Sequence, residues 1–166
     1  MSKKLAIGDK APIFSGTDKK GKFITTEDFL GKKNLVLFFY YADGSPICTK
    51  EACAFRDTYS EFAVMGAILM GISSDSVESH RLFSDENHLP FILISDSTGG
   101  IQEMFGLSKT LGLIPERATF VIDKEGIIRH IFSSQLSAQR HVEEALRGLR
   151  EIQNDEVIKL QKNNMG

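Results

Sequence analysis

Residues 35–41 form an unbroken apolar run, LVLFFYY. Such a run, bounded by turn signals, predicts a buried strand. The small residues at 42–44 then favour a turn. Ser45 and Pro46 follow, and these are typical of a helix N-cap and of a first helical position. The sequence therefore predicts a core strand that leads through a tight turn into a helix.

Both cysteines of the chain lie in this strand-to-helix segment. Cys48 falls in the first turn of the predicted helix, where unpaired N–H groups and the helix dipole stabilise a thiolate over a thiol. Because the thiolate is the nucleophile, Cys48 is placed to react. Cys53 points roughly 140° away from Cys48 around the helix, at about 100° per residue. By itself, either cysteine is equally compatible with a buried apolar role.

Composition indicates one soluble globular domain over residues 1–166, with 42% apolar and 25% charged residues. The net charge of −2 gives no reason to expect a nucleic-acid or anionic-membrane partner. No apolar run approaches membrane-spanning length, and the first residues lack the apolar stretch of a signal peptide. We therefore expect a cytoplasmic protein. The polar residues 161–166 are expected to fray.

Strand and helix patterns alternate along the chain. Strands are predicted at 11–16, 23–25, 35–41, 67–73, 91–95, 119–122 and 127–132, and helices at 46–64, 76–88, 101–105 and 137–160. The first two strands predict an N-terminal β-hairpin, a single helical turn is expected at 26–31, and 106–116 is expected to be a loop. This order predicts an α/β fold, a mixed sheet flanked by helices. Chemistry in such sheets lies beyond the carboxyl ends of strands, where Cys48 is expected.

The four histidines are scattered and show no ligand spacing. Two cysteines without a nearby histidine fall short of a zinc-binding set. We therefore expect neither a metal nor another cofactor. Two closely spaced cysteines are a poor disulfide framework, but they suit a redox pair.

The segment FFYYADGSPICTKEACAFRD, followed later by RATFVID, resembles a peroxiredoxin, and most closely the peroxiredoxin Q branch, also called bacterioferritin comigratory protein. The resemblance extends from GDKAP at residues 8–12 to the last helix. It implies a thioredoxin-like fold and the reduction of hydrogen peroxide and organic hydroperoxides. It also implies recycling by thioredoxin or a similar dithiol protein, and a monomer.

The resemblance also assigns roles by position. Cys48 corresponds to the peroxidatic cysteine and Cys53 to the resolving cysteine, while Arg117 corresponds to the active-site arginine. Ser45 stands where the family has threonine, which keeps the hydroxyl, and Glu51 matches a glutamate that supports the arginine. From the residues alone, Cys53 could be merely buried, Ser45 only an N-cap, and Arg117 a surface partner of Glu116.

Tyr41 is the main departure from the family pattern, which usually has proline seven residues before the peroxidatic cysteine. That proline helps to shape the pocket and to shield the thiolate from water. The replacement therefore bears on the rate and substrate range more than on the reaction type.

The resemblance implies that a sulfenic acid on Cys48 condenses with Cys53 to give a disulfide. In an intact helix, Cα atoms five residues apart are roughly 8–9 Å apart. A disulfide needs less than about 7 Å, so we expect the first turns of the helix to unwind after oxidation.

Two other functions remain open on the sequence. A general thiol–disulfide oxidoreductase usually carries C-x-x-C, whereas the spacing here is C-x-x-x-x-C. A redox sensor would use the same cysteine pair as a switch, and Tyr41 is compatible with that role.

Overall fold

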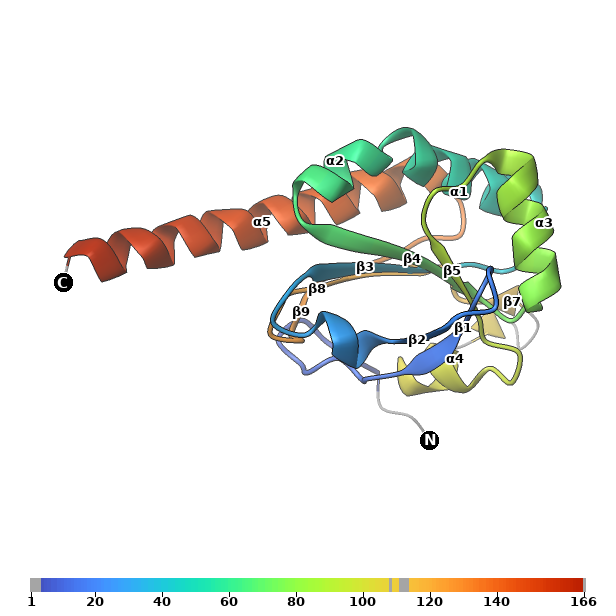
Figure 1. Cartoon of the computed structure of the whole chain (residues 1–166), viewed down its shortest axis with the longest axis horizontal. Coiled ribbons are helices and arrows are strands. Elements are labelled where there is room, and N and C mark those ends of the chain that lie inside the picture. Colours follow the sequence, from blue (N-terminus) through green and yellow to red (C-terminus); the bar gives the residue numbers. More distant parts are fainter. Residues whose placement is uncertain (1–3, 108, 111–113, 166) are drawn as a thin grey trace.

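The computed structural model describes residues 4–107, 109–110 and 114–165. A seven-stranded sheet runs through it in the order β2-β1-β5-β4-β3-β8-β9 (Figure 1). Its strands are β1 Ser15–Asp18, β2 Phe23–Thr25, β3 Asn34–Phe39, β4 Ala67–Ser73, β5 Ile92–Ser95, β8 Ala118–Ile122 and β9 Ile128–Ser133. The predicted α/β architecture with a mixed sheet is confirmed.

The centre of the sheet is parallel and its edges are antiparallel. Strands β3, β4 and β5 run parallel, and β8 pairs antiparallel with β3. The predicted N-terminal hairpin is β1–β2, which joins the sheet by pairing β1 antiparallel with β5. Every residue of β3 is buried, as the apolar run predicted, because β3 lies in the middle of the sheet between β4 and β8.

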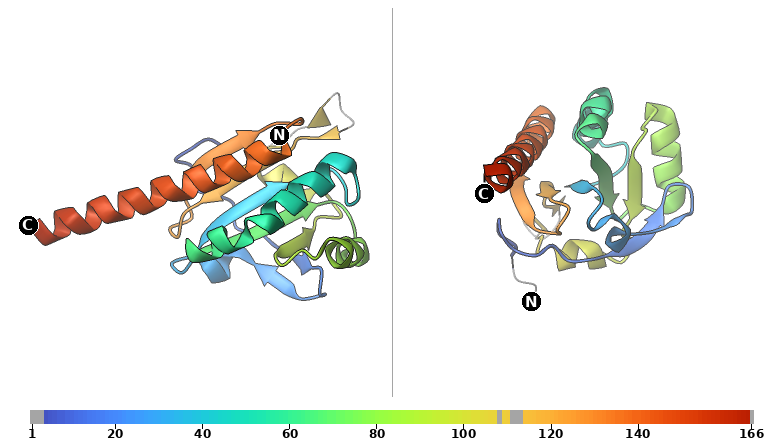
Figure 2. Two further views of the ribbon diagram at one scale, coloured as in Figure 1. Left: turned by 90° about the horizontal axis from the view of Figure 1, so that it is seen from above. Right: turned by 60° about the vertical axis from the view of Figure 1, so that its left-hand side comes forward.

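Helices cover both faces of the sheet. Helices α1 Pro46–Asp57, α2 Tyr59–Val64, α3 Val77–Asn87 and α5 Ala138–Met165 lie on one face, and α4 Gly100–Met104 lies on the other (Figure 2). The alternation of side chains along β3 divides the core accordingly. Val36 and Phe38 pack toward α1 and α5, whereas Leu37 and Phe39 pack toward α4.

The helix predicted over 46–64 is divided into α1 and α2 at Thr58. The hydroxyl of Thr58 donates to the backbone carbonyls of Ala54, at 2.8 Å, and Phe55, at 3.3 Å. Such side-chain bonds to the preceding turn bend helices. The predicted buried face nevertheless continues across the break, since Cys48, Ala52, Phe55 and Phe62 are buried and Tyr59 packs against them.

Several predicted boundaries were wrong. The first strand begins at Ser15 rather than at residue 11, because the Ala11 N–H bonds to the Gly126 carbonyl instead of a sheet neighbour. The expected loop at 106–116 contains the short pair β6 Lys109–Thr110 and β7 Ile114–Pro115, while Gly112 lies outside the described residues. Helix α5 continues to Met165, past the predicted helix end at residue 160.

The other predicted elements agree closely. The helical turn at 26–31 is a 3₁₀ helix, η1 Thr26–Phe29, and helix α3 begins after an N-cap at Ser76. Among the described residues, no helix is both long and apolar enough to cross a membrane.

Candidate active site

The start of α1 is built as the sequence predicted. Ser45 is the N-cap, with its side-chain oxygen accepting the Cys48 N–H at 3.4 Å, and Pro46 is the first helical residue. Gly44 supplies the turn before it with φ +80°, a conformation that residues with a Cβ rarely adopt. Cys48 therefore lies in the first turn of α1 with its side chain buried, 1% exposed.

Arg117 directly precedes β8, the strand next to β3, and from there it reaches Cys48. Its Nη1 donates to Cys48 Sγ at 2.7 Å. The contact follows from the pairing of β3 with β8, which sets Phe39 opposite Ala118 and so brings Arg117 to the end of β3 where α1 begins. Arg117 is buried, so the alternative role as a surface partner of Glu116 is wrong.

Glu51 lies one turn after Cys48 and is fully buried. Its Oε2 accepts a hydrogen bond from Nη2 of Arg117, so one guanidinium connects the thiol and the carboxylate. Burial raises the pKa of Glu51 to about 7, and the positive charge of Arg117 opposes this shift. Within the described part of the chain, Glu51 Oε1 and Arg117 Nε have no hydrogen-bond partner.

His141 is a buried neighbour of this pair that the sequence reasoning missed. Its Nε2 lies 4.0 Å from Glu51 Oε2 and donates to the Ser134 carbonyl at 2.9 Å. Burial lowers the pKa of His141, so the ring is neutral and Nδ1 accepts from the Thr119 hydroxyl at 2.8 Å. The sequence did offer one signal for the burial of His141: it directly precedes Val142, which belongs to the apolar stripe of the last helix.

A second buried network, also missed, holds the loop before α1. Asp43 accepts from the Tyr40 hydroxyl at 2.6 Å and lies 2.7 Å from Nδ1 of His80. Nε2 of His80 donates to the Ile94 carbonyl at 3.1 Å, and the Asp43 N–H donates to Asp75 at 2.9 Å. The network joins the loop to α3 and to the carboxyl ends of β4 and β5.

This network also bears on metal binding. Asp43, Asp75 and His80 each bring one ligand atom within 4.8 Å of the others, a grouping that the scattered histidines did not indicate. Asp43 and His80 already bind each other. This contact holds the loop before α1 against α3, which accounts for the grouping without a metal.

Cys53 faces away from Cys48, as its helical position predicted. It is partly exposed, and its Sγ lies 3.7 Å from Oδ1 of Asn87 at the end of α3. Both cysteines are free thiols. Tyr41, the departure from the family pattern, is 45% exposed.

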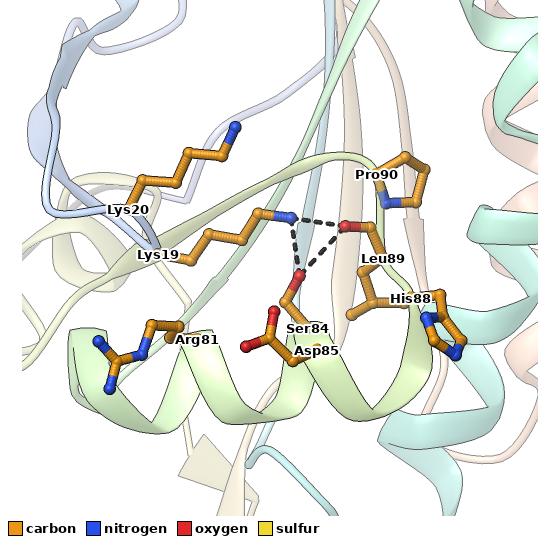
Figure 3. Close-up of a pocket in the computed structure, with 8 residues that line it drawn as sticks. All are labelled: Lys19, Lys20, Arg81, Ser84, Asp85, His88, Leu89 and Pro90. Carbon is orange, nitrogen blue, oxygen red and sulfur yellow. Dashed lines mark hydrogen bonds between the residues drawn. The ribbon is translucent and has the colours of Figure 1, made fainter.

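A pocket of about 500 Å³ lies elsewhere, between the β1–β2 turn and α3 (Figure 3). The ammonium of Lys19 donates there to Ser84 Oγ, at 2.8 Å, and to the Leu89 carbonyl, at 2.5 Å. Arg81 also lines the pocket, but its guanidinium points away from Lys19 (Figure 3). Lys19 therefore ties the hairpin to α3.

The residues around Cys48 suit attack on a small electrophile. The guanidinium of Arg117 places a charged donor at Sγ of Cys48, and hydrogen bonds from a charged donor are stronger than those from a neutral one. Cys48 also lies in the first turn of α1, where backbone N–H groups and the positive end of the helix dipole can stabilise negative charge. The burial of Cys48 restricts access to small molecules.

The family model described as AhpC/TSA family matches residues 7–131 of the chain. The chloroplastic peroxiredoxin Q of Sedum lineare is 39% identical over 150 residues, covering 90% of this chain and 80% of the relative. The putative peroxiredoxin bcp of Coxiella burnetii is 38% identical over 150 residues, covering 86% of this chain and 97% of the relative.

Solved structures agree with the sequence relatives. Peroxidoxin BcpB from Mycobacterium tuberculosis superposes with a TM-score of 0.82 at 36% identity, covering 89% of this chain and 98% of that one. A cysteine-to-serine mutant of PrxQ from Xylella fastidiosa has a TM-score of 0.82 at 27% identity, covering 90% of this chain and 98% of that one. The thioredoxin-like fold is thereby confirmed. The chain belongs to the AhpC/TSA family, in its peroxiredoxin Q branch, and is a thiol-dependent peroxidase.

Proposed function

We propose that Cys48 is the peroxidatic cysteine and Cys53 the resolving cysteine of a two-cysteine peroxidase contained in one domain, residues 1–166. The observation that carries the proposal is the guanidinium of Arg117, which binds Cys48 Sγ and Glu51 together in a buried site. A buried arginine joined to a cysteine in the first turn of a helix favours the thiolate that peroxide reduction needs.

In the first step, the Cys48 thiolate attacks one peroxide oxygen and the O–O bond breaks. The other oxygen leaves as hydroxide or alkoxide and takes up a proton, and Cys48 becomes a sulfenic acid. Arg117 and the hydroxyl of Ser45 donate to the oxygens as charge moves along the O–O axis. Glu51 holds Arg117 in position, and Tyr41 affects the rate and the range of peroxides.

In the second step, Cys53 attacks Sγ of Cys48, the S–O bond breaks, and water is released as the disulfide forms. Cys48 and Cys53 lie in one intact helix, with Cα atoms roughly 8–9 Å apart by helix geometry, so the first turns of α1 must open. Thioredoxin or a similar dithiol protein then reduces the disulfide. Hydrogen peroxide and organic hydroperoxides are the proposed substrates.

The family requires a peroxide substrate and a thiol reductant, and thioredoxin is the specific reductant that we propose. We further propose a monomeric protein of the cytoplasm that acts without nucleic acid, membrane, metal or other cofactor. The burial of Cys48, a residue that is 1% exposed, speaks against a general thiol–disulfide oxidoreductase, because a protein disulfide does not reach Cys48 while α1 is intact.

The test is peroxide consumption with thioredoxin, thioredoxin reductase and NADPH for the wild type, Cys48→Ser and Cys53→Ser. We expect no turnover in Cys48→Ser. In Cys53→Ser we expect one oxidation per chain without thioredoxin-dependent recycling. Full turnover in Cys53→Ser would remove Cys53 as the resolving cysteine. A wild type that forms the disulfide but shows no turnover would instead favour a redox sensor.

A further inference from the structure

A tight turn connects β3 to α1. The Ser45 N–H donates to the Ala42 carbonyl at 3.3 Å and closes this turn. Asp43 and Gly44 are its two central residues, and the φ of +80° at Gly44 suits the second of them. Ser45 then caps α1 by accepting the Cys48 N–H at 3.4 Å. The placement of the turn therefore determines where α1 begins and where Cys48 lies.

Asp43 is the residue of this turn that other elements hold. Its carboxylate accepts from the Tyr40 hydroxyl at 2.6 Å and from the Ser79 hydroxyl at 2.8 Å. The same carboxylate lies 2.7 Å from Nδ1 of His80, and the Asp43 N–H donates to Asp75 at 2.9 Å. Burial raises the pKa of Tyr40, so its hydroxyl keeps the proton that it donates. Asp43 is thus fixed by both its main chain and its side chain.

The partners of Asp43 are fixed in turn. His80 is fully buried on α3, and its Nε2 donates to the Ile94 carbonyl of β5 at 3.1 Å. Asp75 accepts from the hydroxyl of Ser73, the last residue of β4, at 2.7 Å. The turn is therefore attached to α3 and to the carboxyl ends of two sheet strands, and these elements lie outside the segment whose opening we propose.

Two attachments from opposite sides of β3 thus locate Cys48. Arg117 donates to its sulfur at 2.7 Å from the β8 side, whereas Asp43 fixes the start of α1 from the side of β4 and β5. Reacting groups must be held closely, because a misplacement of about 1 Å can cost roughly 100-fold in rate. The distance between Cys48 and Arg117 therefore depends on the turn as well as on the pairing of β3 with β8.

We propose that Asp43 is a positioning residue for peroxide reduction, because it fixes the turn that places Cys48 against Arg117. The inference rests on the proposed role of Cys48 as the peroxidatic cysteine. Asp43 acts through the backbone of the turn and not through contact with the peroxide.

The step that Asp43 serves is the attack of the Cys48 thiolate on one peroxide oxygen. The S–O bond forms, the O–O bond breaks, and the other oxygen leaves as hydroxide or alkoxide and takes up a proton. The sulfur is oxidised and the peroxide is reduced.

A purely structural role for Asp43 is the alternative, in which the network stabilises the fold without affecting the site. Loss of stability alone leaves the rate of Cys48 oxidation unchanged as long as the protein stays folded. A loosened turn lowers that rate in the folded protein. It does not slow the later formation of the disulfide, since that step needs the start of α1 to open.

The first experiment measures the loss of the Cys48 thiol after mixing with hydrogen peroxide in a Cys53→Ser background. Circular dichroism verifies that each variant is folded at the temperature used. Tyr40→Phe removes only the hydroxyl that donates to Asp43, and should slow the reaction about three-fold, for one of several hydrogen bonds that hold the turn. Asp43→Asn should slow it about ten-fold, because the turn is loosened while every group that contacts the peroxide remains.

Each variant has a matched control. Tyr59→Phe removes a tyrosine hydroxyl on α2. His130→Gln breaks another contact between a histidine and a carboxylate, the 2.6 Å pair of His130 with Glu144. Both controls should keep the rate of Cys48 oxidation.

If Asp43→Asn lowers the free energy of unfolding but reacts within two-fold of its parent, Asp43 is only a structural tie and the proposal is overturned. Should Asp43→Asn not fold, Tyr40→Phe decides the question, since a rate equal to that of Tyr59→Phe overturns the proposal in the same way.

The second experiment uses the two-cysteine protein after one equivalent of hydrogen peroxide, quenched at intervals by acid and alkylated. We expect Asp43→Asn to slow the loss of the Cys48 thiol, while the disulfide forms from the sulfenic acid at least as fast as in wild type. Unchanged Cys48 oxidation with slower disulfide formation would overturn the role of Asp43. A wild type whose Cys48 does not react with peroxide would overturn the proposed function itself, so the two failures are distinguishable.

Discussion

Arg117 donates to the sulfur of Cys48 at 2.7 Å although the two residues are 69 positions apart in the chain. The contact exists because β8 pairs with β3, and the helix that carries Cys48 starts where β3 ends. The local sequence around Ser45 and Pro46 places the thiol of Cys48, whereas the cation comes from the residue just before β8, far along the chain.

Arg117→Gln should slow the reaction of Cys48 with hydrogen peroxide by about 100-fold, the usual cost of losing one donor to a developing anion. Arg117→Lys should retain part of the rate, because it keeps a charge but cannot bind Cys48 and Glu51 with two nitrogens. The measurement is single-turnover loss of the Cys48 thiol in a Cys53→Ser background. A rate in Arg117→Gln within two-fold of the parent would contradict the assigned role.

Glu51→Gln should change how stability depends on pH. Burial raises the pKa of Glu51 from 4.5 to about 7 in the folded protein. A raised carboxyl pKa means that the folded state binds the proton more tightly than the unfolded state. The Glu51 contribution to stability is therefore present below pH 4.5 and is lost as the pH rises toward 7, by up to about 3 kcal/mol.

Urea unfolding at pH 5, 6, 7 and 8 measures this contribution as the difference between wild type and variant. Glu51→Gln should remove part of the decline in unfolding free energy between pH 5 and 7. Glu143→Gln, an exposed position on α5, is the control and should run parallel to the wild type. Parallel curves for Glu51→Gln would show that Glu51 does not take up a proton in this range.

Asp43→Asn should destabilise the protein by about 3 kcal/mol, because it removes the carboxylate that faces His80 in a buried pair. Ser79→Ala removes only a hydroxyl that donates to the same carboxylate, and should cost about 1 kcal/mol. The measurement is the free energy of unfolding in urea. Equal small losses in both variants would mean that the contact between Asp43 and His80 does not anchor the loop.

Oxidation should expose the start of α1 selectively. Hydrogen exchange followed by mass spectrometry should show faster exchange at residues 44–53 in the disulfide form than in the reduced form. Exchange in α2, beyond the break at Thr58, should stay the same. Peroxide-treated Cys53→Ser controls for oxidation of Cys48 alone. Unchanged exchange at 44–53 in a verified disulfide form would refute the unwinding.

Local signals were sufficient for the start of α1. Ser45 and Pro46 define a helix start within a few residues, so the position of Cys48 in the first turn followed from sequence alone. The buried strand β3 was equally accessible, because its run of apolar residues has one simple explanation. The order of strands and helices then led to the mixed sheet.

Tertiary contacts were not accessible in the same way. The residues alone favoured a surface role for Arg117, and only the family resemblance pointed to the active site. The sequence shows no grouping of His80 or His141, because their partners lie on other elements, 37 residues away at Asp43 and 22 residues away at Thr119. The division of the long helix was missed because Thr58 acts through a hydroxyl bond that does not interrupt the apolar pattern.

The break at Thr58 also limits how much of the chain must be rebuilt in each proposed catalytic cycle. Since α1 ends at Asp57, its opening involves at most 12 residues. Helix α2 stays packed beside β4, so α1 can re-form from a fixed neighbouring helix. Helices of about 20 residues form within roughly a microsecond. Typical enzymes turn over on the order of 10 times per second, so remaking α1 takes a negligible share of the cycle.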